Sequence, residues 1–262
     1  MSREPVAGQR IWIVGASSGI GAELAHELVR RGARVAISAR RREELEAVAG
    51  SGRSDAASIA AAPIAVVPVD VTDRASVDGA AAAVRAELGG LDGVIHSAAY
   101  WKQFDATTWD RDDFARHIEV NLLGLNNVLG AVVPEFARSG AGHVVGIASV
   151  AGYRGLAGSE AYGATKAAQL NLLEAMRASL SRSGVRVTTV SPGFVRTPMT
   201  DTNRFTMPFL IDADEAARSI ADGMESGDDD ISFPLPMAVA MRVARLVPGR
   251  AWTALSSRAS RE

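Results

Sequence analysis

The chain has 262 residues, of which 47% are hydrophobic and 22% are charged, and its formal net charge is -2. This length and apolar content fit one globular α/β domain with a sizeable core. The near-neutral charge gives no broad basic field, so we expect no nucleic-acid partner. Cysteine is absent and only four histidines occur, which excludes disulfides and thiolate chemistry, and we expect no metal site. No uncharged apolar run reaches the ~18 residues of a membrane span. We therefore expect a cytoplasmic protein without an integral membrane span.

Short apolar segments alternate with stretches of helical periodicity along the chain. The apolar segments are rich in Val and Ile and lack strict alternation, as expected for parallel strands covered by helices on both faces. This pattern predicts a Rossmann-like, doubly wound parallel sheet of about seven strands in a single dinucleotide-binding domain over 1–262. The expected strands are 11–14, 35–38, 64–69, 93–97, 143–148 and 185–190, the expected helices are 20–31, 41–49, 74–88, 111–137, 160–182 and 213–226, and 51–62 is expected to be a surface loop.

A glycine-rich segment joins the first expected strand to the first expected helix. Residues 14–21 read VGASSGIG. At the start of a helix, free backbone N–H groups and the helix dipole favour a pyrophosphate, and glycine lets it approach the backbone. Glycine also serves tight turns and close packing, but the strand-turn-helix context favours a nucleotide. The residues predicted to hold the phosphates are Gly15, Ser17, Ser18, Gly19, Ile20 and Gly21.

The residues after the second expected strand favour NADP over NAD. An NAD-selective site presents an acidic residue to the ribose 2'-hydroxyl about twenty residues after the glycines, whereas 38–42 reads SARRR here. A guanidinium can bind a 2'-phosphate in a forked geometry, so we expect Arg40 and Arg41 to hold it. The alternative is that these arginines pair with the glutamates of 43–46 on a solvated helix. Asp70 ends the third expected strand, where it can meet an adenine amine or cap the next helix.

Tyr162 and Lys166 stand one helical turn apart, and Tyr162 follows Ser149 by 13 residues. Side chains at i and i+4 share one face of a helix, with Cβ atoms roughly 6 Å apart. A free tyrosine titrates near ~10, and a nearby positive charge favours the phenolate. We therefore expect Lys166 to lower the pKa of Tyr162 and make the phenol a general acid or base. A Tyr-x-x-x-Lys pair alone is common on amphipathic helices, but here it follows a glycine-rich loop.

Further motifs complete an order that is typical of one enzyme family. After the glycine segment come Asn121, Ser149, the Tyr162 and Lys166 pair, and a segment over 191–197 that reads SPGFVRT. Over about 10–200, the chain resembles the short-chain dehydrogenase/reductase family. The resemblance implies that Tyr162 gives a proton to a substrate carbonyl held by Ser149, and that Lys166 binds the nicotinamide ribose and lowers the Tyr162 pKa. The Asn121 region would hold water in a proton relay.

The resemblance also implies the remaining cofactor contacts and the reaction. Two segments depart from the family pattern: Val14 stands where Thr is usual, and 96–99 reads HSAA in place of Asn-Asn-Ala-Gly. We expect His96 to be structural. The predicted activity is NADP(H)-dependent reduction of a ketone or aldehyde to an alcohol, or the reverse, on a partly hydrophobic small molecule. The alternative is a non-catalytic NADP-binding sensor or interaction protein on the same fold. The implied cofactor contacts are Asp70, Val71, Ser97, Ala98, Tyr162, Lys166, Pro192, Gly193, Val195 and Thr197.

The substrate region and the assembly are predicted from loop aromatics and small residues. We expect substrate contacts from 100–104, 150–156 and 199–210, with 200–248 forming a lid and a C-terminal helix region. Segment 235–247 could form a lid, an oligomer contact or a membrane-surface helix. We expect 228–230 to be a solvated turn and 249–262 to be a flexible tail. Small residues on the Tyr162 helix favour a homodimer, with a homotetramer as the alternative. The expected aromatic walls are Trp101, Tyr153, Phe205 and Phe209.

Overall fold

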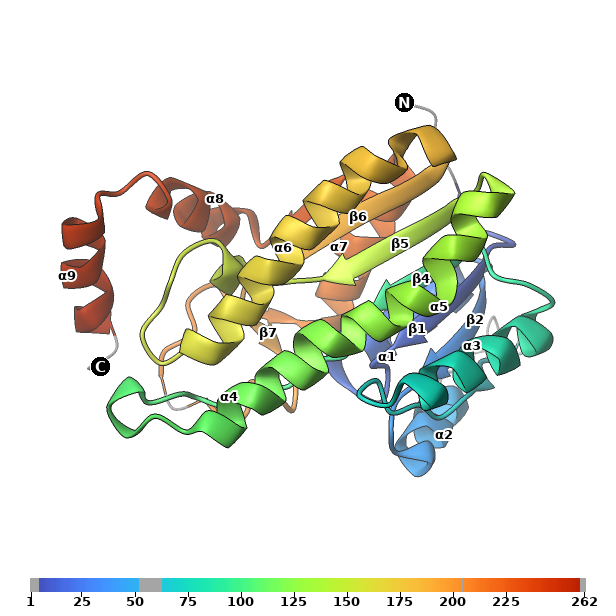
Figure 1. Cartoon of the computed structure of the whole chain (residues 1–262), viewed down its shortest axis with the longest axis horizontal. Helices are drawn as coiled ribbons and strands as arrows, with labels where there is room; N and C mark the ends of the chain where they lie inside the picture. The colour runs from blue at the N-terminus through green and yellow to red at the C-terminus, as the bar shows by residue number, and fades with distance from the viewer. Residues whose placement is uncertain (1–4, 52–62, 204, 260–262) are drawn as a thin grey trace.

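A parallel sheet of seven strands runs through the molecule, and the computed structural model describes residues 5–51, 63–203 and 205–259 (Figure 1). The strand order is β3-β2-β1-β4-β5-β6-β9, and every neighbouring pair is parallel. The reversal of strand order between β1 and β4 is the switch point at which doubly wound folds bind ligands. The strands are β1 (Arg10–Val14), β2 (Arg34–Ser38), β3 (Ala65–Val66), β4 (Gly93–His96), β5 (Gly142–Ile147), β6 (Val185–Pro192) and β9 (Asp230–Phe233), while β7 (Val195–Arg196) and β8 (Ile211–Asp212) form a separate pair.

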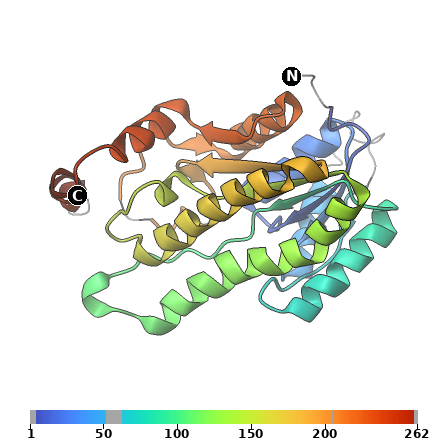
Figure 2. The same cartoon turned by 45° about the horizontal axis from the view of Figure 1, so that its top comes forward.

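Helices cover both faces of the sheet, as Figure 2 shows. Successive strand residues point to opposite faces, so Ile13 of β1 packs in the core beneath α1 and α7, whereas Trp12 packs in the core beneath α3, α5 and α6. Both side chains are fully buried. These two cores confirm the predicted α/β class. The α-helices are α1 (Gly19–Arg30), α2 (Arg42–Ser51), α3 (Arg74–Leu88), α4 (Arg111–His117), α5 (Gly124–Ser139), α6 (Glu160–Leu180), α7 (Ala213–Ser226), α8 (Leu235–Ala244) and α9 (Gly249–Ala259).

The helix expected over 111–137 contains a π-helical segment. The segment η3 (Ile118–Leu123) separates α4 from α5 without interrupting the helical path. Together Arg111–Ser139 is long and apolar enough to pass a composition test for a membrane span. However, its inner face packs on the sheet through side chains such as Val128 and Val132, which are fully buried. A core helix of this kind passes the same test, so the finding gives no support to a membrane span.

Three expectations differ from the structure, two at the edge strands of the sheet and one at the C-terminal helix. Only Ala65–Val66 of the expected strand 64–69 pairs as a strand. The expected turn 228–230 was wrong at its last residue, because Asp230 begins β9. The Arg177 guanidinium binds both carboxylate oxygens of Asp230, each at 3.1 Å, which draws this acidic segment onto the sheet. Gly249–Ala259, expected as part of a flexible tail, forms α9. Most of the expected loop 51–62 lies outside the described residues.

Candidate active site

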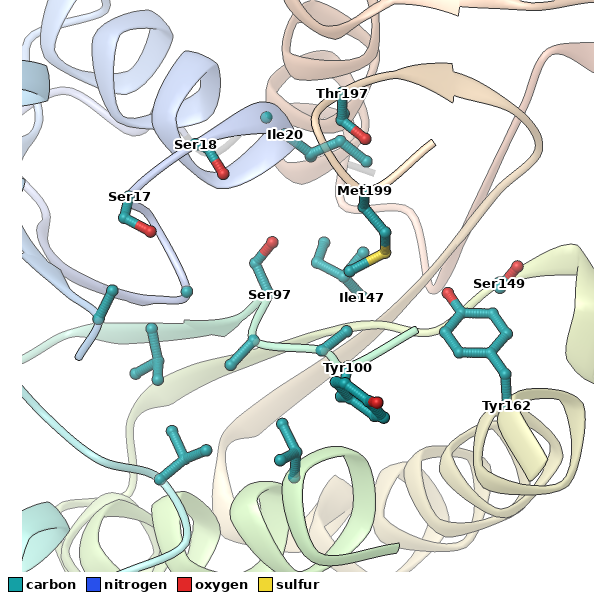
Figure 3. Close-up of a pocket in the computed structure, with 18 of the residues that line it drawn as sticks. Ser17, Ser18, Ile20, Ser97, Tyr100, Ile147, Ser149, Tyr162, Thr197 and Met199 are labelled. Carbon is teal, nitrogen blue, oxygen red and sulfur yellow. The ribbon is translucent and has the colours of Figure 1, made fainter. Parts of the chain in front are cut away.

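A pocket of about 310 Å³ opens at the carboxyl ends of β1, β4 and β5. In Figure 3, Ser17 and Ser18 lie at one side of it, Ser149 and Tyr162 lie at the other, and Met199 projects into the space between them. The pocket therefore brings the glycine loop and the Tyr-x-x-x-Lys helix to one site. It is lined by every predicted cofactor residue except Gly21.

The glycine loop packs so closely against its own backbone and the segment after β4 that a Cβ is excluded at two of its glycines. A Cβ on Gly15 would lie 2.3 Å from the Ala98 nitrogen, and one on Gly21 would lie 2.2 Å from the Gly15 oxygen. Gly19 has φ +59, which favours glycine. Ser18 is the N-cap of α1, but its side chain makes no capping hydrogen bond. The first N–H groups of α1 therefore remain available to a phosphate, and the loop fits a dinucleotide.

The three consecutive arginines after β2 have different surroundings. Arg41 pairs with Glu44 at 2.5 Å and Arg42 pairs with Glu46 at 3.4 Å. These two side chains therefore form the ion pairs expected in the alternative, although Arg41 also lines the pocket. Arg40 lines the pocket as well, is exposed, and has no ion-pair partner among the described residues.

Asp70 closes a local turn at the pocket edge. Its Oδ1 accepts hydrogen bonds from the backbone N–H and the hydroxyl of Thr72, at 3.0 and 2.8 Å. Asp70 does not cap α3, because Asp73 is the N-cap and accepts from the Ala75 N–H. Burial raises the pKa of Asp70, but the bonds from Thr72 and the charge of Arg40 outweigh it, so the pKa is lowered. The carboxylate therefore stays charged near Arg40.

Ser149 and Tyr162 lie together at the α6 end of the pocket, which we call the chemical end. The Ser149 Oγ accepts a hydrogen bond from the Ala151 N–H at 3.1 Å, which fixes the side chain at the end of β5. Burial raises the pKa of Tyr162 to about 12, although a hydrogen bond with Ser149 lowers it in part. The expectation that Lys166 lowers this pKa was wrong for the structure as it stands, since desolvation is the larger effect. Tyr162 therefore keeps its proton at neutral pH.

Lys166 is fully buried behind Tyr162. Its Nζ donates to the Ile147 carbonyl at 2.8 Å and to Gln169 Oε1 at 2.9 Å. The Nζ lies over the face of the Tyr162 ring, 5.4 Å from its centroid. Desolvation lowers the pKa of Lys166 to about 7. The ammonium is thus easily deprotonated, and its hydrogen bonds hold it beside the strand end.

Asn121 lies in the π-helical segment and joins three elements. Its side-chain amide accepts from the Tyr100 N–H at 2.6 Å and donates to the Tyr100 carbonyl and to Thr165 Oγ1, both at 3.0 Å. Its backbone carbonyl accepts from Gln169 Nε2 at 2.5 Å. Because Gln169 also accepts from Lys166, hydrogen bonds run from Asn121 to Lys166. The wider helical turn places this carbonyl toward α6.

His96 occupies the buried end of β4. Neither of its ring nitrogens has a hydrogen-bond partner among the described residues. Desolvation, together with the charge of Lys166, lowers the pKa of His96 to about 3. The imidazole is therefore neutral at physiological pH, in agreement with a structural residue.

The four predicted substrate aromatics are not gathered at one place, and none lines the pocket itself. Trp101 packs edge-on against Tyr162, with ring centroids 5.1 Å apart. Tyr153 bonds to Ser232 through its hydroxyl, and Phe205 packs on Phe194. Phe209 is exposed and has φ 57. The structure therefore brings only Trp101 to the chemical end.

Several lining residues carried no motif in the sequence. Met199 belonged to a predicted substrate segment, but Ile147, Val120 and Arg116 were not predicted at all. Only their position in the fold could have indicated these residues as pocket-lining. Ile147 ends a strand, and the other two lie where the 111–139 helical segment passes the strand ends. Tyr100 also lines the pocket, held by Asn121 and by Asp113 Oδ1 at 2.7 Å.

Comparison with known proteins agrees with this geometry. The family model described as short chain dehydrogenase matches residues 9–207. This chain belongs to the short-chain dehydrogenase family. It is therefore an oxidoreductase, and the match covers both the glycine loop and the Tyr162 helix.

Individual short-chain dehydrogenases are similar over most of their length. An uncharacterized oxidoreductase of Myxococcus xanthus is 38% identical over 246 residues, covering 94% of this chain and 95% of the relative. A short-chain dehydrogenase of Sphingobium yanoikuyae, solved in complex with NADPH, has a TM-score of 0.78 at 29% identity, with 95% of each chain covered. A short-chain type dehydrogenase/reductase of Mycobacterium ulcerans gives a TM-score of 0.78 at 28% identity, covering 89% and 91%.

Proposed function

We propose that this short-chain dehydrogenase is an NADPH-dependent carbonyl reductase acting on a partly hydrophobic ketone or aldehyde. The observation that carries the proposal is the hydrogen-bonded Ser149 and Tyr162 pair at one end of a pocket whose other end is the glycine loop. A dinucleotide lying along this pocket would have its phosphates at α1 and its nicotinamide near Tyr162. When bound, the nicotinamide would supply the hydride.

The preference for NADPH rests on Arg40. Its guanidinium is exposed at the pocket and is free of ion pairs with the described acids, so it can bind a 2'-phosphate in a forked, charge-assisted geometry. No acidic residue occupies 38–42 to favour an unphosphorylated ribose. The NADPH-bound structure of the Sphingobium yanoikuyae relative is in line with this preference.

The proton side of the reaction is assigned to this chain's own residues. Tyr162, whose pKa is about 12, carries a proton at neutral pH and would give it to the carbonyl oxygen as the carbonyl carbon accepts hydride. Ser149 would hydrogen-bond the same oxygen and stabilise its developing charge. The phenolate would then regain a proton from solvent, and a charged Lys166 would stabilise it meanwhile. The protonated phenol is the form that reduction requires, whereas alcohol oxidation would need the phenolate.

Trp101 would form one wall of the carbonyl site, because its ring packs edge-on against Tyr162. The indole N–H donates to Asn203 Oδ1 at 2.9 Å, which ties this wall to the 199–210 segment. An apolar wall beside the proton donor suits a partly hydrophobic substrate. We include in the proposal a lid formed by 200–248, a single domain, a cytoplasmic location and a homodimer formed through the small residues of α6.

The test is NADPH oxidation, followed by absorbance, across a panel of ketones and aldehydes of increasing apolar size, with NADH run in parallel. The proposal predicts turnover that is faster with NADPH and improves with apolar substituents. Turnover that is faster with NADH would overturn the Arg40 assignment. NADPH binding without any turnover over a broad panel would overturn the carbonyl assignment.

A further inference from the structure

The outward face of α8 is apolar and uncovered. Leu235, Val239 and Val243 recur every fourth residue along one side of the helix, and Leu246 continues this side just beyond its end. Their exposed fractions are 69%, 48%, 56% and 84%. We call these four residues the α8 stripe. The seven large hydrophobic side chains described as exposed include all four, so uncovered apolar surface is concentrated here. Such a concentration on a monomer marks an interaction site.

The opposite face of α8 already has its partner. Met237 and Met241 are buried against Val150, and Tyr153, Leu156 and Phe194 pack around them. Two further contacts tie the end of α8 and the helix α9 to the body, because Arg154 donates to the Ala244 carbonyl at 3.1 Å and Trp252 Nε1 donates to the Gly155 carbonyl at 2.7 Å. The α8 stripe is therefore held facing outward. α8 and α9 lie together at one end of the molecule, away from α3 (Figure 1).

The charge around the stripe favours one class of partner. The sequence from 231 to 261 contains five arginines and no acidic residue, although the chain as a whole has a net charge of -2. Arg242, Arg245 and Arg250 are exposed and form no ion pair with an acidic residue in the described ranges. However, Arg242 donates to Ser232 Oγ at 3.2 Å, and Arg245 lies over the ring of Tyr153. Apolar side chains bordered by arginines match a bilayer with anionic headgroups. A two-fold contact between copies would instead bring the same arginines together.

We infer that the α8 stripe and its bordering arginines dock this protein peripherally on an anionic phospholipid bilayer. The four apolar side chains would enter the boundary between headgroups and acyl chains, and the arginines would contact the phosphates. The buried face of α8 lies against the segment around Gly193, where a Cβ would be 3.0 Å from Met237 Cγ. Docking would thus place α8 between the bilayer and the segment that borders the pocket. This inference is independent of the proposed reaction.

Vesicle co-sedimentation of the full chain, without cofactor or substrate, tests the inference. The probes are phosphatidylcholine vesicles and vesicles containing about one third phosphatidylglycerol. We expect binding to the anionic vesicles, weaker binding at high salt, and at least about tenfold weaker binding to phosphatidylcholine alone. The double variant Val239→Glu, Val243→Glu should lower binding to the anionic vesicles by at least about tenfold.

The matched control is Ala82→Glu, Ala83→Glu, which adds the same two charges at exposed positions of α3. It should bind anionic vesicles within about twofold of the wild type. Circular dichroism and the melting temperature verify that both double variants are folded. Failure of the wild type to sediment with anionic vesicles overturns the inference, as does equal binding by the α8 variant. A sedimentation-velocity shift caused by the α8 variant, without any vesicle binding by the wild type, would instead assign the stripe to a contact between copies.

Discussion

The two ends of the pocket are formed by different kinds of chemical groups, which differ in their exposure to solvent. The end at α1 is formed by backbone N–H groups, two serine hydroxyls and the exposed Arg40, all close to solvent. The end at α6 is formed by the half-buried side chains of Ser149 and Tyr162 and the fully buried Lys166, and there desolvation is the main cause that raises the pKa of Tyr162 to about 12 and lowers that of Lys166 to about 7. The contrast indicates that cofactor binding and proton transfer depend on opposite ends of the same pocket. Changes at the first end should alter cofactor affinity, and changes at the second should alter the rate of turnover.

Tyr162→Phe should give the largest effect. It removes the proton donor but keeps the ring that packs against Trp101. General acid catalysis contributes roughly 10²- to 10⁴-fold, so kcat should fall by about that factor. Steady-state kinetics on the best substrate of the carbonyl panel measures it, with NADPH binding followed by fluorescence titration. Turnover near the wild-type rate would exclude Tyr162 as the donor.

Arg40→Ala should weaken NADPH binding at the α1 end of the pocket. Loss of a charge-assisted hydrogen bond costs about 1.5–3 kcal/mol, so the KM for NADPH should rise by roughly 10- to 100-fold, while the KM for NADH changes little. The kcat at saturating NADPH should stay within about twofold of the wild type. An equal rise in the KM for NADPH and for NADH would show that Arg40 does not bind the 2'-phosphate.

A third prediction concerns the buried His96 behind the chemical end. Its pKa is about 3 in the folded chain against an ordinary 6.5, so unfolding takes up a proton between these values. The free energy of unfolding should therefore fall with falling pH by roughly 1.4 kcal/mol per unit in this window. His143, whose pKa burial also lowers to about 3, adds a similar slope.

His96→Asn removes the His96 part of this dependence. The slope of unfolding free energy against pH, from urea unfolding between pH 6 and 4, should then fall by roughly 1.4 kcal/mol per pH unit, the contribution of one proton. An unchanged slope in the variant would show that His96 is accessible to protons in the folded chain. Cofactor affinity at neutral pH serves as the check that the pocket is intact.

Arg41→Ala should have the smallest effect and serves as the neighbour control for Arg40. Arg41 already pairs with Glu44 on the exposed side of α2, and exposed pairs of this kind contribute only about 0–1 kcal/mol. The KM for NADPH should rise by less than about fivefold. If the two alanine variants lose NADPH affinity equally, the arginines act together and the assignment to Arg40 alone is wrong.

The glycine loop, the Tyr162 helix and the core strands were predictable from the sequence because each has a local signature. The loop is marked by its glycines between a strand and a helix, and the buried strands by runs of Val and Ile. Strand β9 was missed because the preceding aspartates indicate a turn, and Arg177 from a distant helix draws them in. The π-helical segment at Asn121 depends on contacts with Tyr100 and Thr165 that no local pattern encodes.

The electrostatics were the least predictable part of the site. Helical spacing correctly placed Lys166 on the Tyr162 side of its helix, but the direction of the Nζ depends on the Ile147 carbonyl, which belongs to another element. The extent of burial, which decides both pKa values, is likewise a property of the assembled fold. The same reason explains why only Trp101 among the four predicted aromatics reached the chemical end.

The most direct measurement is a side-by-side comparison of Tyr162→Phe and Arg40→Ala, with NADPH affinity and single-turnover hydride transfer determined for each variant. The account predicts that Tyr162→Phe loses the transfer rate and keeps the affinity, whereas Arg40→Ala loses the affinity and keeps the transfer rate once saturated. Loss of the same quantity in both variants would contradict the separation of binding and chemistry between the two ends of the pocket.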